Sequence, residues 1–213
     1  VGRRLTDMVA DQDAGEPAEE TIRFHLSIGL AFSDLLVRAA LPGEPRWWVL
    51  SGEPVIDGGG RAAGFRGTST DVTEQRLAEA EADRLARFDP MTGLPNRAYL
   101  PRLIEQAMSG RSVGRSALML VEVEGFSAIS GALGYAMLKL VAERLEATVG
   151  NQGKAGRLGE GGFYVVLSAP PVHAELARLA NEIAWKLSHS YRIDGMPIRI
   201  SANIGIAISP DDG

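Results

Sequence analysis

The chain has 213 residues, of which 45% are hydrophobic and 23% charged, and its formal net charge is -5 at pH 7. This composition excludes a disordered protein, because it supplies enough apolar surface for one large or two small folded domains. The acidic balance argues against a general nucleic-acid or membrane-surface binder, since those partners reward clustered basic residues. The chain has no cysteine, which excludes disulfides, thiolate metal sites and cysteine nucleophiles.

The sequence shows no signal for export or membrane insertion. It has no apolar run of about 18 residues and no recognisable signal peptide. The lack of cysteine is compatible with a reducing compartment, so we expect a cytoplasmic location. The chain begins with valine and stops after a strand-like segment. We therefore expect a piece of a longer protein, with neighbouring domains on either side.

The first 72 residues predict one helix followed by an antiparallel meander. Apolar positions are mixed among polar ones over 16–29, which favours a helix. Three strand-like runs follow at 32–41, 46–56 and 62–70, and the junctions between them are rich in proline and glycine. Such turn sequences between short apolar runs are typical of strands joined as hairpins.

Two segments of this stretch carry a family resemblance: RWWVLSGEPV at 46–55 and DVTE at 71–74. They resemble the last strands of PAS sensor domains and the Asp-Ile-Thr-Glu sequence with which those domains end. The resemblance implies that residues 1–72 are the C-terminal part of a PAS domain. The two strands that begin the PAS fold have no counterpart that we can find in the sequence.

Residues 73–88 contain neither glycine nor proline and are rich in Glu, Ala, Arg and Leu, which predicts a continuous linker helix. Its apolar side chains fall on one side, at Ala78, Ala82, Leu85 and Phe88. A narrow apolar stripe on an exposed helix is buried most simply against a second copy, so we expect a homodimer through this helix. The alternative is a helix that packs on its own domain.

The remaining residues predict an α+β fold with a mainly antiparallel sheet. The expected elements are a helix at 99–109, a strand at 116–123, a helix at 133–149, a hairpin with arms at 157–158 and 163–168, a helix at 172–189 and a strand at 198–208. Both faces of the strand at 116–123 are apolar, which indicates a central strand covered on both sides.

Two motifs in this part carry a second resemblance: DPMTGLPNR at 89–97 and GEGGF at 159–163. They resemble the N-terminal motif and the name-giving motif of the GGDEF family, the diguanylate cyclase domains. The resemblance implies that residues 89–213 form a GGDEF domain without its last elements. It also implies a sheet like that of adenylyl cyclases and polymerase palms, with flanking helices.

The resemblance further implies a two-metal chemistry. In the family, carboxylates from the first strand and the hairpin hold two magnesium ions, which activate one GTP for attack on another to give cyclic di-GMP. Glu122 stands at the first-strand position and is the candidate metal ligand. Within the motif Gly159, Glu160, Gly161, Gly162 and Phe163, both hairpin carboxylates are replaced by Gly161 and Gly162. We therefore expect a degenerate site with no catalytic residue.

The candidate nucleotide-binding positions are Phe126, Ser130 and Lys139. The resemblance places Ser130 and Lys139 where the family has an asparagine and an aspartate that read the guanine edge. Lysine offers only donors, whereas the N1 and N2 hydrogens of guanine need an acceptor. Any binding of GTP and magnesium is therefore expected to be weak.

Simpler structural explanations exist for several of these residues. Glu122 and Glu124 alternate along a strand, so one of them can be a solvated edge charge. The glycines of the hairpin are also explained by turns that need a positive φ. Trp47 and Trp48 could line a ligand pocket, but adjacent aromatic residues on a strand more often give one core and one surface side chain.

These observations favour a regulatory domain of a cyclic di-GMP signalling protein, catalytically degenerate and coupled to a PAS sensor. The resemblance implies control of a downstream EAL phosphodiesterase domain in the same protein. Two alternatives stay open. One is an active or weakly active diguanylate cyclase, and the other is a dimerisation scaffold that binds no nucleotide.

Overall fold

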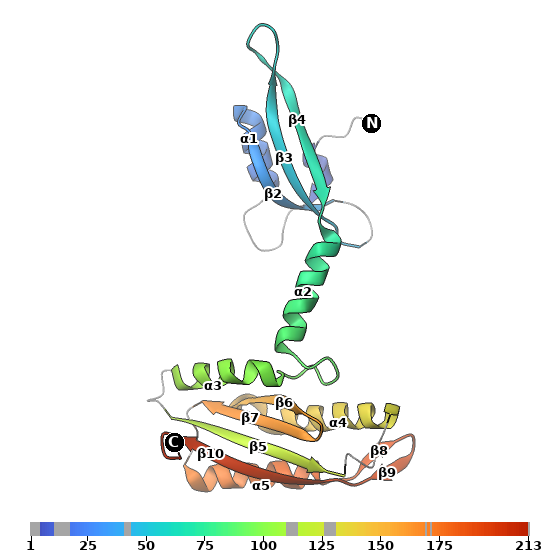
Figure 1. Ribbon diagram of the computed structural model, residues 1–213, viewed down its shortest axis with the longest axis vertical. Helices are drawn as coiled ribbons and strands as arrows, with labels where there is room; N and C mark the ends of the chain where they lie inside the picture. Colours follow the sequence, from blue (N-terminus) through green and yellow to red (C-terminus); the bar gives the residue numbers. More distant parts are fainter. Residues whose placement is uncertain are drawn as a thin grey trace. The chain divides into compact units, whose positions relative to one another are not determined.

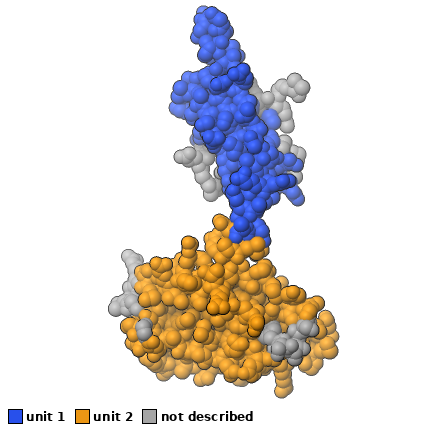
Figure 2. Space-filling model, viewed as in Figure 1, with its two compact units in different colours: residues 1–82 blue, residues 83–213 orange. Residues whose placement is uncertain are grey.

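The computed structural model describes residues 5–10, 18–40, 44–109, 115–125, 131–168, 170 and 172–212. The chain forms two compact units, residues 1–82 and residues 83–213 (Figure 2). The division falls within one long helix, the linker helix expected from the sequence. In the part of the chain that the structure describes, no helix is both long and apolar enough to cross a lipid bilayer.

The first unit is built on a four-stranded antiparallel sheet in the order β1-β2-β3-β4, of which Figure 1 labels β2, β3 and β4. Its elements are the 3₁₀-helix η1 (Leu5–Met8), β1 (Val9–Ala10), α1 (Ala18–Ile28), β2 (Phe32–Ala39), β3 (Trp47–Ile56) and β4 (Ala62–Asp71). The expected helix and antiparallel meander are confirmed. The two-residue strand β1 was not expected, because a segment so short carries no readable periodicity.

A small apolar core and a tight turn hold this sheet. The buried core side chains come from β1, α1, β2 and β3, at Val9, Ile22, Val37 and Leu50. Between β3 and β4, the carboxylate of Asp57 accepts the backbone N–H groups of Gly59 and Arg61, both at 2.9 Å. This aspartate turn sets the register of the β3–β4 hairpin.

Helix α2 (Thr73–Arg87) follows β4 after the single residue Val72. The carboxylate of Asp71 accepts the backbone N–H of Thr73 at 3.0 Å, and hydrogen bonding to the side chain and then to the backbone of Thr73 lowers the pKa of Asp71. None of the helix's residues is buried, and Leu85 is 45% exposed. The expected stripe needs one correction, because the ring of Phe88 lies 6.3 Å from that of Tyr99 and is partly covered within the second unit.

The second unit is an α+β domain with a four-stranded antiparallel sheet in the order β10-β5-β7-β6. Its helices are η2 (Arg97–Tyr99), α3 (Leu100–Ser109), α4 (Gly131–Val149), η4 (Gly150–Gln152) and α5 (His173–Leu187). Its strands are β5 (Ser116–Glu124), β6 (Lys154–Gly159), β7 (Gly162–Ser168), β8 (Tyr191–Ile193), β9 (Met196–Ile198) and β10 (Ser201–Ser209). The expected fold class is confirmed.

The sheet separates two apolar clusters, and α3 and α5 lie on opposite sides of it (Figure 1). The larger cluster takes alternate side chains of β5 and β7, such as Met119 and Phe163, together with residues of α4 and α5. The smaller cluster joins Tyr164 of β7 to α3. Coverage of this second face is incomplete, because Leu120 is 48% exposed. The expectation of a central strand covered on both sides is therefore corrected for Leu120, in the middle of β5.

The short hairpin β8–β9 was missed in the sequence. Its turn residues Asp194 and Gly195 have φ values of 51° and 80°, as expected for the Asp-Gly turns that favour two-residue hairpins. Because Met196–Ile198 pairs with Tyr191–Ile193, the last strand begins at Ser201 and not at residue 198 as expected. The Asp-Gly pair was the signal available in the sequence.

Candidate functional site

The motif at 89–97 forms a tight hydrogen-bonded turn at the end of α2. The Asp89 carboxylate accepts both the backbone N–H of Thr92, at 2.8 Å, and its hydroxyl, at 2.7 Å. Gly93 has a φ of 74° and donates its N–H to the Asp89 carbonyl, a conformation that favours glycine. The turn places Leu94 in the larger core cluster. The motif is thus a device that fixes the path of the chain into the domain.

Asn96 ties this turn to the helices on either side of it. Its backbone N–H donates to the Arg87 carbonyl at 2.9 Å, and its side-chain amide donates to the Leu85 carbonyl at 2.9 Å. Its side-chain oxygen accepts the N–H of Tyr99 at 3.0 Å and so caps η2. One residue therefore satisfies carbonyls at the C-terminus of α2 and an N–H at the next helix.

Arg157 holds the loop between β6 and β7 from inside the protein. Its side chain is 5% exposed, and its guanidinium donates to the carbonyls of Gly159 and Gly162, both at 3.0 Å, and to that of Glu160. Burial lowers the pKa of Arg157, but an arginine stays protonated in proteins. Its charge is thus used to organise backbone carbonyls.

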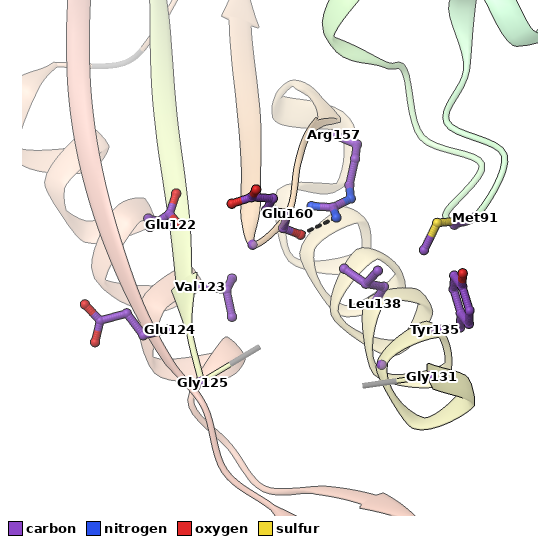
Figure 3. Close-up of a pocket in the computed structure, with 12 residues that line it drawn as sticks. Met91, Glu122, Val123, Glu124, Gly125, Gly131, Tyr135, Leu138, Arg157 and Glu160 are labelled. Atoms are coloured by element: carbon purple, nitrogen blue, oxygen red, sulfur yellow. Dashed lines mark hydrogen bonds between the residues drawn. The ribbon is translucent and has the colours of Figure 1, made fainter. Parts of the chain in front are cut away.

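Glu160 stands in the loop with an unusual backbone. Its φ is 40° and that of Gly159 is 123°. Glycine adopts positive φ values readily, whereas residues with a Cβ are strained there. The side chain of Glu160 lines the neighbouring pocket, and Figure 3 shows its carbonyl facing the Arg157 guanidinium. The glutamate therefore occupies a position whose backbone suits glycine.

A pocket of about 700 Å³ lies between β5, the start of α4 and the β6–β7 loop (Figure 3). Three glutamates line it, Glu122, Glu124 and Glu160, together with Met91 and Tyr135. Glu124 is bound by the edge strand β10, where its carboxylate accepts hydrogen bonds from Ser201 and Asn203. Of the two alternating glutamates, Glu124 is therefore the one held in a side-chain network on the sheet.

Glu122 lies beside the two glycines of the loop. A Cβ built on Gly161 would lie 3.6 Å from Glu122 Oε1, and a Cβ built on Gly162 would lie 3.6 Å from Glu122 Oε2. Acidic side chains at these two positions would therefore begin close to the Glu122 carboxylate on β5. The structure thus brings together the three positions that the family resemblance had grouped. Only Glu122 carries a carboxylate.

This donor set does not fit a two-magnesium site. Magnesium prefers oxygen ligands in a strict octahedral arrangement, and each ion needs carboxylates to hold it. Among the described residues, no group of three or more His, Cys, Asp or Glu side chains is placed to hold a metal ion. No reaction step through magnesium is therefore assigned to this pocket.

The candidate nucleotide-binding residues fare differently from one another. Phe126 and Ser130 lie outside the described residues. Lys139 is exposed on α4 and does not line the pocket, which takes Tyr135 and Leu138 from that helix. Its nucleotide-binding role stays a prediction. The lining role of Tyr135 was missed, although its position nearly one turn before Leu138 places the two on one helix face.

The comparisons with known proteins agree with this geometry. The family model described as "Diguanylate cyclase, GGDEF domain" matches residues 86–213. The chain belongs to the GGDEF family. The match covers the 89–97 turn, Glu122 and the whole β6–β7 hairpin of this GGDEF protein.

Two curated relatives show the context in which such domains occur. The bifunctional diguanylate cyclase/cyclic di-GMP phosphodiesterase MucR of Pseudomonas aeruginosa is 38% identical over 152 residues, which cover 68% of this chain and 22% of MucR. The cyclic di-GMP phosphodiesterase PdeR of Escherichia coli is 27% identical over 150 residues, with 68% and 22% covered. This chain spans about a fifth of the length of both relatives.

Solved structures confirm the fold. A sensory box/GGDEF family protein from Caulobacter crescentus matches with a TM-score of 0.54 and 28% identity, over 60% of this chain and 86% of that one. The GGDEF domain of TpbB from Pseudomonas aeruginosa matches with a TM-score of 0.51 and 28% identity, over 58% and 76%.

Proposed function

We propose that this GGDEF domain is a regulatory module of a cyclic di-GMP signalling protein and makes no cyclic di-GMP itself. The observation that carries the proposal is the pair Gly161 and Gly162 beside Glu122. Without carboxylates at these glycines, the pocket lacks the ligands for the two ions that would bring a triphosphate and an attacking hydroxyl together. The backbone of the family's site is kept while its chemistry is lost.

The electrostatics of the pocket support weak nucleotide binding at most. The carboxylates of Glu122 and Glu160, which line the pocket, repel a triphosphate. The guanidinium of Arg157 already donates to loop carbonyls, so few of its N–H groups remain to donate to a bound phosphate. GTP and magnesium are therefore expected to bind weakly or not at all.

The proposal extends to the parts on either side of the domain. The antiparallel sheet that precedes α2 has the strand pattern of the PAS resemblance and would receive the signal. MucR and PdeR are both named as cyclic di-GMP phosphodiesterases, which supports a downstream EAL phosphodiesterase as the regulated output. The exposed Leu85 of α2 supports a homodimer through this helix.

The test is direct. The purified chain is incubated with GTP and magnesium, the products are separated by liquid chromatography, and GTP binding is measured by calorimetry. No cyclic di-GMP is expected. Product formation that is abolished by Glu122→Ala and kept by the matched control Glu124→Ala would overturn the proposal and establish an active cyclase. If neither product nor GTP binding is found, the domain acts as a scaffold that needs no nucleotide.

A further inference from the structure

Tyr164 of β7 attaches the hairpin to the 89–96 turn through its hydroxyl. The side chain is fully buried under α3, in the smaller apolar cluster. Its hydroxyl oxygen lies 3.2 Å from the Pro95 carbonyl oxygen and 3.1 Å from that of Asn96, so its single proton is shared between two adjacent acceptors of the turn. A buried hydroxyl normally requires such a partner.

The ring of Tyr164 occupies space that only glycine can leave open on the neighbouring strand. Gly156 is its partner in the β6–β7 register. A Cβ on Gly156 would lie 2.0 Å from Tyr164 Cζ and 2.3 Å from its hydroxyl oxygen. The two residues are therefore matched, and the glycine fixes where the hydroxyl points.

A second bond reaches the same turn from β6. The backbone N–H of Arg157 donates to the Pro95 carbonyl at 2.7 Å. The side chain of Arg157 then holds the carbonyls of the pocket loop. On the other side of the turn, Asn96 binds the carbonyls of Leu85 and Arg87 in α2. Hydrogen bonds thus run without a gap from the last turn of α2 to the loop that carries Glu160.

We infer that Tyr164 is a positioning residue that makes the last turn of α2 and the pocket loop respond as one unit. The inference rests on the proposed regulatory function, because a regulatory domain must pass a change in its incoming helix to its pocket. The physical basis is a turn whose Pro95 and Asn96 carbonyls accept hydrogen bonds from both strands of the hairpin. Tyr164→Phe removes the hydroxyl that binds the Pro95 and Asn96 carbonyls and leaves the aromatic ring in place.

The test measures amide hydrogen exchange of the full chain by NMR. The perturbation is Asn96→Ala, which cuts the side-chain bond to α2, and the remote reporter is the Val123 amide, which donates to the Gly161 carbonyl at 3.0 Å. With Tyr164 present, Asn96→Ala should speed exchange at Val123 about five- to tenfold, the effect of losing about one hydrogen bond. In the Tyr164→Phe background the same change should stay within about twofold.

Tyr191→Phe is the matched control. Tyr191 is also buried, and its hydroxyl has no hydrogen-bond partner among the described residues, so this change should leave the coupling between Asn96 and Val123 intact. Equal responses at Val123 in the Tyr164 and Tyr164→Phe backgrounds would overturn the inference. A loss of coupling in Tyr191→Phe as large as that in Tyr164→Phe would do the same.

A measurement on the unmodified chain covers the case in which Tyr164→Phe fails to fold. Under increasing urea, the amides of Asn96, Arg157 and Val123 should open with one common free energy, as members of one cooperative unit. Separate opening of Val123 would refute the coupling. No nucleotide is present in either experiment, so the result does not depend on whether the proposed function itself holds.

Discussion

Glu122 lies directly opposite Gly162 in the β5–β7 register, and a Cβ on that glycine would lie 3.6 Å from the Glu122 carboxylate. The backbone of this domain therefore still presents the place where carboxylates would converge. What holds that backbone is independent of metal binding, because Arg157 binds the loop carbonyls from within and Phe163 enters the core. Scaffold and chemistry are separable in this site.

Restoring the two hairpin carboxylates should not restore catalysis. The double variant Gly161→Asp, Gly162→Glu regains the family's acidic residues, but a Cβ at Gly161 would lie 2.5 Å from the Val123 carbonyl oxygen. The loop must shift to admit it, and Lys139 still offers no acceptor for guanine. Chromatography of a reaction with GTP and magnesium should show no cyclic di-GMP. Product from this double variant would mean that the two glycines are the sole defect.

Phe163 should contribute far more to stability than Glu160. The Phe163 side chain is fully buried, so Phe163→Ala should lower the free energy of unfolding by about 3–5 kcal/mol. Glu160→Ala keeps the backbone and the carbonyl that Arg157 binds, and should stay within about 0.5 kcal/mol of the parent. Urea denaturation of both variants measures the difference. A larger loss at Glu160 would reveal a bound ion or partner at the loop.

Glu160→Gly should stabilise the chain or leave it unchanged. At a φ of 40°, a residue with a Cβ costs about 1–2 kcal/mol relative to its preferred conformations. Glycine removes that strain but brings about 0.5–1 kcal/mol of extra backbone entropy to the unfolded state. The net gain should lie between about 0 and 1.5 kcal/mol in the same denaturation assay. A clear loss of stability would show that the Glu160 side chain makes a contact worth more than its strain.

Stability should fall at high pH through Tyr164. Burial raises the pKa of Tyr164 from 10.0 to about 12, so the folded state favours the neutral phenol. A raised folded-state pKa gives stability that is complete below pH 10 and is lost as the pH rises toward about 12, by up to about 1.4 kcal/mol per pH unit. The difference in unfolding free energy between the parent and Tyr164→Phe should therefore shrink over this range. A difference in unfolding free energy that stays constant from pH 10 to about 12 would contradict a raised pKa of Tyr164 in the folded state.

The linker helix should support a weak dimer. Leu85 is exposed on a helix without buried residues, and burying one large side chain contributes only about 1.5–3 kcal/mol. Sedimentation should show a dimer that Leu85→Glu converts to monomer. Ala80→Glu, on the opposite side of α2, is the matched control and should leave it intact. A dimer that persists in Leu85→Glu would exclude dimerisation through the Leu85 side of α2. A monomeric parent would exclude the homodimer altogether.

Much of the fold is determined by local pattern in the sequence. The period-two alternation of a strand predicts Phe163 and Val165 on one face and Tyr164 on the other, and the structure confirms this. The break between the long helix and the domain was also readable, because Pro90 cannot continue a helix. The short hairpin β8–β9 was not predicted, because a strand of three residues is too short to show a readable alternation of apolar and polar side chains.

The site depended on both levels. The replacement of two carboxylates by Gly161 and Gly162 is visible in the sequence alone, because a motif is a matter of residue identity. Tertiary structure alone makes the Pro95 carbonyl the acceptor for the backbone N–H of Arg157, which lies 62 positions later in the chain. It also places the ring of Tyr164 in the space that Gly156 leaves by having no Cβ. Contacts between distant segments follow from how elements pack, and side-chain spacing along one segment holds no record of them.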